Sequence, residues 1–417
     1  MSSVRDALLI QKDEIQRKII QKYIKRDLKI EGMESDIIKV IIGPRRSGKS
    51  FLAMQTMIAF GNFGYANFDD ETLVEVDDYN EIVSVLNSIY SNPRFLLLDE
   101  IQNLSKWELF VNRLQRQGYN LLITGSNSNL LSMELATHLT GRHLSTTLFP
   151  LSFREMIAAE ESEIPESEKK RKFQEYVIQG GYPEPYVKGV DYREYLAQLF
   201  ESTIYKDIMR RYRIRKPRTI EDLTSYLLSN IAKPFSFNRL SRMLGVESVH
   251  TIKKYLSYLE EAFIFFELEC YTYKLKDHIK SSRKIYCIDN GFITAKAFRI
   301  IADTGRLLEN LVAVEIKRRS FSGKFEFYFW KNQQQEEIDF VIKKGTGITE
   351  LIQVCAEPSR EITRSREVKA LLKGSRDLNC SNLKVLTEDF EATEESQWYG
   401  IKEIIHFVPI WKWLLEP

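Results

Sequence analysis

The sequence has 417 residues, of which 43% are hydrophobic and 28% charged, and this balance is typical of a folded chain rather than a disordered one. A chain of this length exceeds one ordinary hydrophobic core, so two or three domains are expected. Lysine and arginine number 60 against 58 aspartate and glutamate, and the formal net charge of +2 selects no class of partner.

The sequence argues against membrane-spanning, secreted and zinc-dependent proteins. No apolar run reaches the roughly 18 residues that span a bilayer, and the first residues lack the apolar segment of a signal peptide. The four cysteines form no CxxC pair and the five histidines form no HExxH pattern, which disfavours a zinc site or a disulfide framework. We therefore expect a cytoplasmic protein without a membrane partner.

The first predicted element is an amphipathic helix within residues 4–27. Ile15, Ile19 and Tyr23 recur at every fourth position, so they would lie on one face of a helix.

The next segment, IIKVIIGPRRSGKSFLAMQ, combines an apolar strand, a turn and the start of a helix. Residues 43–50 match the G-x-x-x-x-G-K-[ST] pattern of a phosphate-binding loop. Gly43 and Gly48 permit conformations that turn successive N–H groups toward an anion, and the N-terminus of the following helix adds positive charge. We expect Lys49 to reach the β- and γ-phosphates and Ser50 to offer its hydroxyl to Mg²⁺. The nucleotide-binding residues are then Gly43, Pro44, Arg45, Arg46, Ser47, Gly48, Lys49 and Ser50.

A second apolar strand, in RFLLLDEIQ, ends in an acidic pair. We expect Asp99 to complete the metal site with Ser50, and Glu100 to polarise the attacking water as a general base. An acidic pair at the end of a strand is weak evidence alone. Downstream of a phosphate-binding loop, it indicates hydrolysis of ATP with Mg²⁺.

A third apolar strand, in YNLLITGSNSNLL, also ends in polar residues. A polar side chain at that position could sense the γ-phosphate of a nucleotide held by the loop, and either Ser126 or Asn127 would serve. Arg142 is a candidate arginine for the γ-phosphate, in cis or from a neighbouring subunit. The alternative is that Arg142 is a solvated loop residue.

Five stretches together resemble the AAA-type P-loop ATPases of archaea and bacteria, over roughly residues 20–200: GPRRSGKSFL, YANFDDETL, LLLDEIQNLSKWE, LLITGSNSNLL and LFPLSFREM. The resemblance implies an α/β fold with a parallel sheet. The strand before the loop would be central, the strand ending in Asp99 and Glu100 would be its neighbour, and a helical lid would follow residue 150. It also implies that KRDLKI lies close to the adenine.

Residues 205–218, YKDIMRRYRIRKPR, hold seven basic residues and one acidic residue with interleaved aromatics, so they form either a solvated helix face or a phosphate-contacting patch. Three predicted helices follow, ending with VESVHTIKKYLSYLEEAF, and two β-rich runs come next. This order is that of a helix-turn-helix with a wing. Candidate groove residues on the third helix are His250, Thr251, Lys253, Lys254 and Ser257, and candidate wing contacts are Lys274, Lys276, Arg283 and Lys284.

The last part begins with a predicted helix, GRLLENLVAVEIKRR, and three short β-rich runs. This order resembles the C-terminal domain of an ATPase family whose tail joins a winged helix to a PD-(D/E)xK nuclease-like fold. In an active nuclease of that fold, a helix acid, a strand aspartate and an E-x-K on the next strand hold Mg²⁺ and orient water. Glu309 and Asp339 fit the first two positions. The E-x-K position reads Gln353-Val354-Cys355.

Charged residues near that position do not restore the predicted site. On a regular strand Glu350 points to the face opposite Gln353, and Glu357 and Lys343 are displaced along their strands. We therefore expect the nuclease-like domain to be inactive.

These predictions divide the chain into four parts. They are an AAA-type P-loop ATPase core at 1–150, a helical lid at 151–204, a winged-helix domain with its basic linker at 205–295, and an inactive PD-(D/E)xK-like domain at 296–417. The expected function is an ATPase that associates with double-stranded DNA through its C-terminal half. The alternative is a nucleotide-dependent regulatory or assembly switch that acts on a protein partner without DNA. A homo-oligomer is compatible with both.

Overall fold

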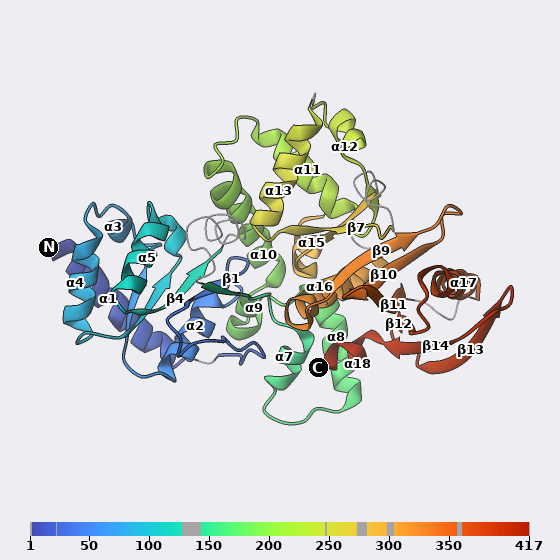
Figure 1. Cartoon of the computed structure of the whole chain (residues 1–417), viewed down its shortest axis with the longest axis horizontal. Helices are drawn as coiled ribbons and strands as arrows, with labels where there is room; N and C mark the ends of the chain where they lie inside the picture. Colours follow the sequence, from blue (N-terminus) through green and yellow to red (C-terminus); the bar gives the residue numbers. More distant parts are fainter. Residues whose placement is uncertain are drawn as a thin grey trace. The chain divides into compact units, whose positions relative to one another are not determined.

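The computed structural model describes residues 2–21, 23–126, 143–246, 248–272, 282–297, 304–356 and 361–416 (Figure 1). The chain divides into two compact units. Unit 1 comprises Met1–Leu151, Pro183–Gly189 and Glu261–Phe263, and unit 2 comprises Ser152–Tyr182, Val190–Glu260 and Ile264–Pro417. No helix within the described residues is long and apolar enough to cross a membrane.

Unit 1 contains a five-stranded parallel sheet in the order β2-β3-β4-β1-β5. The inner strands are nearly continuous apolar runs because both faces of the sheet are covered. The outer strand β5 is largely polar and half-exposed. The strands are β1 (Ile38–Ile42), β2 (Phe63–Asn67), β3 (Phe95–Asp99), β4 (Asn120–Gly125) and β5 (His143–Thr147).

The strand order corrects one expectation from the sequence. The strand that ends in Asp99 is not the neighbour of β1, because β4 lies between them and pairs with both. The polar end of β4 is thereby placed between the phosphate-binding loop and the acidic pair. Thr124 and Ser126 at this end can therefore reach both the phosphate-binding loop and the acidic pair.

The two helices predicted in unit 1, near the N-terminus and after the phosphate-binding loop, are present, with one difference in the first. The first helix ends at Ile19, so Tyr23 lies beyond it and stacks on Phe51 instead, with ring centroids 6.4 Å apart. Ile15 is buried in the core of the unit, as an amphipathic helix requires. The helices are α1 (Ser2–Ile19), α2 (Lys49–Ile58), α3 (Glu71–Val74), α4 (Tyr79–Ile89), the 3₁₀ turn η1 (Ile101–Asn103), α5 (Trp107–Arg116) and α9 (Pro183–Lys188).

Unit 2 begins with a helical segment that is joined to later parts of the unit through Asp289. Its carboxylate accepts the N–H of Gly181 at 2.7 Å and that of Gly291 at 2.8 Å. Gly180 has φ +73°, and a Cβ there would lie 1.7 Å from the Asp289 carboxylate, so only glycine fits. The elements are α7 (Phe153–Ala158), α8 (Glu166–Gln179), α10 (Tyr192–Thr203), the π-helical turn η2 (Ile204–Arg210) and α15 (Asn290–Lys296).

Three helices and a small antiparallel sheet follow the basic segment. The sheet has the order β6-β8-β7. Ile252, Leu256 and Leu259 of the third helix are buried, which is the inward face that their spacing predicts. The elements are α11 (Pro217–Ser229), β6 (Pro234–Phe235), α12 (Phe237–Met243), α13 (Val249–Glu261), β7 (Phe265–Glu269) and β8 (Arg283–Cys287).

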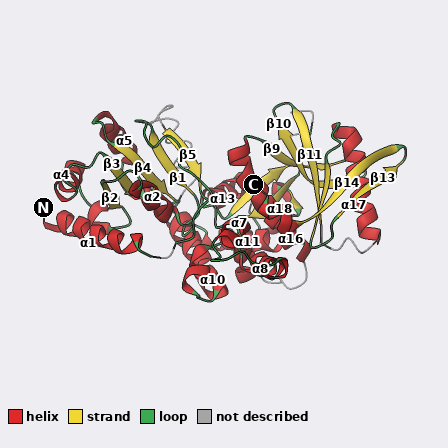
Figure 2. Cartoon of the chain, turned by 90° about the horizontal axis from the view of Figure 1, so that it is seen from below, coloured by secondary structure: helices red, strands yellow, loops and turns green. Residues whose placement is uncertain are grey.

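The C-terminal part of unit 2 is a six-stranded mixed sheet in the order β13-β14-β12-β11-β10-β9, with α17 packed beside it (Figure 2). The predicted helix and three strands are α16, β9, β10 and β11. The other half of the sheet comes from residues after 360, to which the sequence assigned no elements. The elements are α16 (Thr304–Gly323), β9 (Glu326–Lys331), β10 (Glu337–Lys344), β11 (Gly347–Cys355), α17 (Glu361–Leu378), β12 (Leu383–Thr387), β13 (Ala392–Trp398), β14 (Ile401–Pro409) and α18 (Ile410–Leu415).

Candidate functional site

The loop between β1 and α2 depends on two glycines with positive φ. Gly43 has φ +153°, and a Cβ there would lie 2.1 Å from the carbonyl oxygen of Leu148. Gly48 has φ +96° and caps the N-terminus of α2 in the left-handed region. A side chain at residue 43 would push the loop away from the segment that follows β5. The two glycines therefore set the close path of the loop and leave its N–H groups for an anion.

Lys49, the first residue of α2, lies between the loop and the end of β3. Its Nζ donates to the carbonyl oxygens of Gly43 at 3.2 Å and Pro44 at 3.0 Å. The same Nζ is 3.6 Å from Oε1 of Glu100. The side chain is almost fully buried, so the ammonium is fixed at one place where phosphate oxygens held by the loop could accept its protons.

Three hydroxyl groups surround the buried carboxylate of Asp99 at the end of β3. Ser50 Oγ donates to Asp99 Oδ1 at 3.0 Å, the Thr124 hydroxyl donates to the same oxygen, and the Tyr65 hydroxyl donates to Oδ2 at 3.2 Å. Burial, and then the neighbouring charge of Glu100, raise the pKa of Asp99, while the hydrogen bonds from Thr124 and Ser50 oppose this rise. A carboxylate and a hydroxyl oxygen side by side fit the oxygen ligands that Mg²⁺ prefers.

Glu100 is held by contacts on both its backbone and its side chain. The residue has φ +50° in the left-handed region, and its N–H donates to Thr124 Oγ1 at 3.0 Å. The Gln102 amide donates to the Glu100 carboxylate and, at 3.4 Å, to Ser126 Oγ. Burial alone would raise the pKa of Glu100, but the Lys49 ammonium and the Gln102 hydrogen bond outweigh it and lower the pKa. The carboxylate is therefore ionised at neutral pH, as a general base must be.

Gln102 contributes a second polar atom to the same place. Its Oε1 is buried and has no hydrogen-bond partner within the described residues. A buried acceptor of this kind normally takes a hydrogen bond from protein or water. A water molecule beside Glu100 can donate one proton to the carboxylate and the other to this amide oxygen.

Arg26 holds the phosphate-binding loop through hydrogen bonds to backbone carbonyl groups. Its guanidinium donates to the carbonyl oxygens of Ser47 at 2.8 Å and Phe149 at 2.6 Å, and the side chain is buried. Arg26 belongs to the KRDLKI segment that the resemblance places near the adenine. Its contacts join the loop to the chain after β5.

The structure brings most of the predicted nucleotide-site residues together. Lys49, Ser50, Asp99 and Glu100 form one connected group, and Ser126 joins it through Gln102. Asn127 and Arg142 lie outside the described residues. Arg45 is half-buried, and its charge helps to lower the pKa of Glu100. Arg46 is exposed, with one guanidinium nitrogen 3.3 Å from Glu184. The buried Ser47 hydroxyl has no hydrogen-bond partner within the described residues.

The basic segment and α13 present several cations at the surface of unit 2. Arg210, Arg213 and Arg215 are exposed, as are His250, Lys253 and Lys254 of α13. Thr251 and Ser257 are only half-buried candidates. Tyr212 stacks on Tyr258 with ring centroids 3.6 Å apart, which fixes the basic segment against α13.

Two of the four predicted wing contacts, Arg283 and Lys284, are described by the structure, and their contacts do not support binding to DNA. Lys284 is 1% exposed and its ammonium is surrounded by carboxylates, so it cannot reach a phosphate of DNA. Arg283 donates to Glu267, and its other guanidinium nitrogen is 3.0 Å from Glu269. The prediction that Lys284 contacts DNA is therefore wrong. Lys274 and Lys276 lie outside the described residues.

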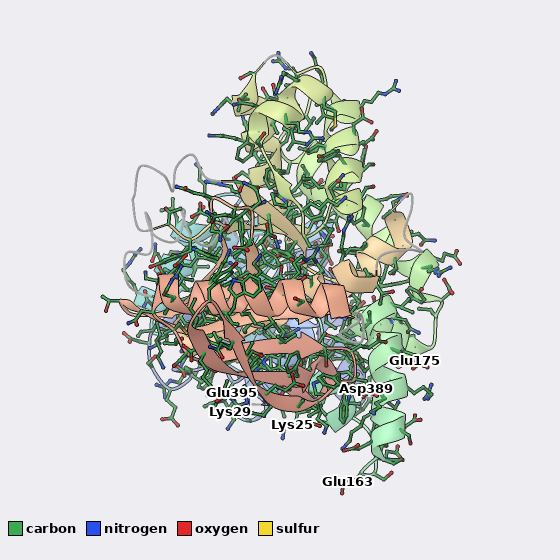
Figure 3. The ribbon with its side chains drawn as sticks, turned by 90° about the vertical axis from the view of Figure 1, so that its right-hand side faces the viewer. Lys25, Lys29, Glu163, Glu175, Asp389 and Glu395 are labelled. Atoms are coloured by element: carbon green, nitrogen blue, oxygen red, sulfur yellow. The ribbon has the colours of Figure 1, made fainter. Side chains whose placement is uncertain are left out.

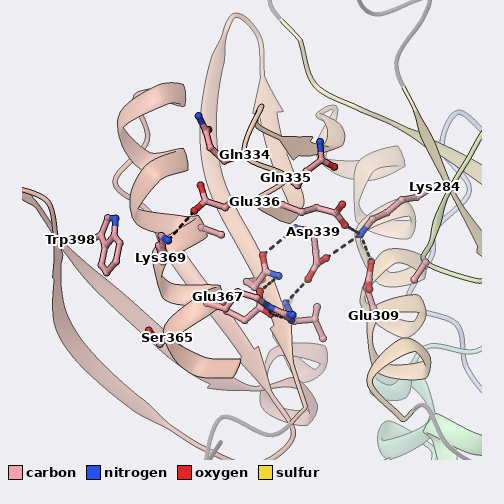
Figure 4. Close-up of a pocket in the computed structure, with 16 residues that line it drawn as sticks. Lys284, Glu309, Gln334, Gln335, Glu336, Asp339, Ser365, Glu367, Lys369 and Trp398 are labelled. Atoms are coloured by element: carbon pink, nitrogen blue, oxygen red, sulfur yellow. Dashed lines mark hydrogen bonds and ion pairs between the residues drawn. The ribbon is translucent and has the colours of Figure 1, made fainter. Parts of the chain in front are cut away.

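A polar pocket of about 720 Å³ lies between α16, α17 and the strands of the C-terminal sheet (Figure 4). Asp339 N–H donates to Gln353 Oε1 at 3.2 Å, and Gln353 Nε2 donates to Glu367 Oε2 at 2.5 Å. Cys355 is buried. Lys284 and Glu367 come from β8 and α17, and the sequence predicted neither of them in this pocket.

Comparisons with known proteins match three parts of this chain to domain families. Residues 35–157 match the family described as AAA domain, and these residues build the loop, Lys49, Asp99 and Glu100. Residues 170–300 and 304–413 match two domains of unknown function, DUF8612 and DUF4143. Residues 35–157 are therefore an AAA domain that carries the phosphate-binding loop.

Similar proteins occur in archaea and bacteria. Uncharacterized protein MJ1544 of Methanocaldococcus jannaschii is 34% identical over 415 residues, covering 94% of this chain and 91% of that protein. An uncharacterized protein of Haemophilus influenzae is 32% identical over 339 residues, covering 76% and 82%. The chain belongs to one family with these two proteins. Among solved structures, the Walker-type ATPase Paby2304 of Pyrococcus abyssi is 15% identical with a TM-score of 0.42, covering 68% of this chain and 95% of its own.

Proposed function

We propose that this protein hydrolyses ATP with Mg²⁺ and associates with double-stranded DNA through unit 2. The observation that carries the hydrolytic part is the convergence of Lys49, Ser50, Asp99 and Glu100 within hydrogen-bond or ion-pair distance. Lys49 would neutralise the β- and γ-phosphates, and Ser50 with Asp99 would hold Mg²⁺. When bound, Mg²⁺ supplies positive charge to the phosphate oxygens. Glu100 would take a proton from the attacking water.

Gln102 is proposed as the residue that positions Glu100 and this water. Its amide donates to the carboxylate, which lowers the pKa of Glu100, and its free Oε1 offers the water a second acceptor. Ser126 would contact the γ-phosphate, and the Gln102 amide would link Ser126 to Glu100.

Gln102→Ala is expected to move the acid limb of the kcat–pH profile to higher pH. A general base works only when ionised, so activity falls as the pH drops through its pKa. Loss of the hydrogen bond raises the pKa of Glu100, and the fall then begins at a higher pH. ATPase rates between acid and neutral pH measure this. Gln115→Ala is the control, because that amide donates to the Asp36 carbonyl instead. An unchanged acid limb in Gln102→Ala would contradict the proposed role.

The proposal of DNA association is supported by the basic segment and the exposed cations of α13. Three helices followed by a small sheet are the elements of a winged helix, in which the third helix lies in the major groove. His250, Lys253 and Lys254 are the exposed candidates on α13 for this role. The experiment is an ATPase assay with duplex DNA, with single-stranded DNA and without DNA. Stimulation by duplex DNA supports the proposal, whereas a rate that depends only on protein concentration favours a switch that acts through a protein partner.

Duplex DNA binding is expected to weaken steeply between about 50 and 200 mM salt, because each phosphate contact releases condensed counterions. Arg213→Gln with Arg215→Gln should reduce the slope of log affinity against log salt concentration by about 2, which corresponds to two phosphate contacts. Lys25→Gln with Lys29→Gln removes the same charge from exposed positions in unit 1 (Figure 3) and should leave the slope unchanged. Equal slopes for both double variants would place the phosphate contacts elsewhere.

The C-terminal domain is expected not to cut DNA. Gln353 is a neutral ligand where an acid is required, and the buried Cys355 thiol cannot replace a fixed ammonium beside the water. Prolonged incubation with plasmid and linear DNA, in Mg²⁺ and in Mn²⁺, measures this. Cleavage by the parent chain that disappears in Asp339→Ala would show a working active site.

A further inference from the structure

Three carboxylates converge on the ammonium of Lys284 in the C-terminal pocket (Figure 4). Its Nζ lies 2.8 Å from Glu309 Oε1, 2.7 Å from Glu337 Oε1 and 3.1 Å from Asp339 Oδ1. The lysine comes from β8, Glu309 from α16, and the other two acids from β10. Elements that are distant in the sequence therefore meet at one nitrogen atom.

This contact set uses the whole capacity of the lysine. An ammonium has three N–H donors, and three carboxylate oxygens lie within bonding distance. Lys284 is 1% exposed, and Asp339 has only 8% of its side chain exposed. Burial acts to lower the pKa of Lys284, but the charges of Glu309 and the other acids outweigh it and raise the pKa. The side chain is therefore a permanent buried cation.

The remaining hydrogen bonds also hold the acids in place. The Tyr286 hydroxyl donates to Glu309 at 2.8 Å, and the Val354 N–H donates to Asp339 Oδ2 at 3.0 Å. Tyr286 and Nζ thus share Oε1 of Glu309, whereas Val354 holds the Asp339 oxygen that does not face Nζ. The cluster is built to surround a positive charge.

Three converging carboxylate oxygens are also what a hard divalent cation takes as ligands. Oxygen ligands lie about 2.1 Å from Mg²⁺, so an ion bound by these three oxygens would occupy the position of Nζ. The three oxygens cannot bind a metal ion and the ammonium at the same time. Among the described residues, no group of three or more His, Cys, Asp or Glu side chains is placed to hold a metal. The Mg²⁺ that the nuclease-like resemblance implies does not fit this arrangement.

We infer that Lys284 is the resident cation of the Glu309–Glu337–Asp339 cluster and takes the place of a divalent metal ion there. The ammonium holds the three carboxylates together without a metal, and its removal turns the cluster into a metal site. The inference concerns unit 2 alone and does not depend on ATP hydrolysis.

The experiment measures Mn²⁺ binding to the nucleotide-free full chain and its thermal unfolding with and without Mn²⁺. The variants are Lys284→Met, which keeps an unbranched apolar side chain and removes the ammonium, and Lys284→Met with Asp339→Asn. Lys331→Met is the matched control, because its ammonium lies 3.5 Å from Glu337 at the rim of the cluster rather than at its centre. Any Mn²⁺ held by the phosphate-binding loop is common to all of these proteins.

Lys284→Met is expected to unfold at a lower temperature than the parent. It is also expected to bind one additional Mn²⁺, with an affinity for this site at least tenfold above that of the parent, a difference of about 1.4 kcal/mol in binding free energy. Mn²⁺ should restore part of the lost melting temperature. The additional site should disappear in the double variant and be absent in Lys331→Met. A folded Lys284→Met protein that binds no more Mn²⁺ than the parent overturns the inference.

The parent chain provides a second test that does not require Lys284→Met to fold. The parent and its Asp339→Asn variant are expected to bind the same number of Mn²⁺ ions, because the parent cluster holds none. One Mn²⁺ fewer in Asp339→Asn would show that a metal binds beside Lys284, and the inference would then be wrong.

Discussion

Glu100→Gln is expected to bind ATP as the parent chain does and to hydrolyse it about 10²- to 10⁴-fold more slowly, the usual contribution of a general base. The substitution keeps the size of the side chain and an acceptor oxygen but removes the negative charge that attracts the proton of water. Binding should persist because Lys49, Ser50 and the loop N–H groups remain. A fluorescent nucleotide measures binding, and phosphate release measures turnover.

Two comparisons make this result specific. Glu75→Gln removes an exposed carboxylate from unit 1 and should hydrolyse ATP at the parent rate. Glu100→Gln also leaves the Lys49 ammonium without its carboxylate partner, so nucleotide affinity should stay equal or rise. Hydrolysis at the parent rate in Glu100→Gln would mean that another group activates the water.

The chemistry of the nucleotide site could be predicted because it is encoded in short local patterns. Gly43 and Gly48 are required by the path of one loop, and Asp99 and Glu100 stand at the end of an apolar run. The order of strands could not be predicted in the same way, since β4 follows β3 in the chain but inserts between β3 and β1 in space. The assignment of β1 and β3 as neighbours was wrong for this reason.

The sequence did not predict the residues that position the catalytic groups of this site. Thr124 bonds both Asp99 and the Glu100 N–H, and Tyr65 bonds Asp99, yet each reads as an ordinary strand residue. Arg26 bonds backbone carbonyls that lie far along the chain, a contact that no spacing reveals. Gln102 carries a local signal, because it is a polar side chain two residues after the predicted base.

Lys284 shows why polar residues in strands are hard to interpret. A lysine in a short strand usually points to solvent, and the order of helices and β-rich runs placed this one on a wing. However, Ile285 and Tyr286 are both buried, so the strand is covered on both faces. A lysine in such a strand needs buried acids, and Glu309 and Asp339 were already suspected of lying together. Glu367 gave no such signal, because the order of α17 and the strands after it was not predicted.

Lys49→Ala is expected to weaken ATP binding by about 10- to 100-fold, because charge-assisted hydrogen bonds contribute about 1.5–3 kcal/mol each. The ammonium is buried between two loop carbonyls and Glu100, so its loss removes a fixed cation from the place where the phosphates would bind. Titration with a fluorescent nucleotide in Mg²⁺ measures the loss. Arg17→Ala, which removes an exposed cation of α1 from the same unit, is the control and should bind as the parent does.

Lys49→Ala should also slow the turnover of the nucleotide that still binds. The Lys49 ammonium lowers the pKa of Glu100, so its removal leaves burial to raise the pKa of this carboxyl group. The kcat–pH profile should therefore lose activity at a higher pH than in the parent chain, in the same direction as for Gln102→Ala. Equal affinity and an unshifted profile would show that Lys49 contacts neither the phosphates nor the base during the reaction. An affinity loss with an unshifted profile would instead confine its role to the phosphates.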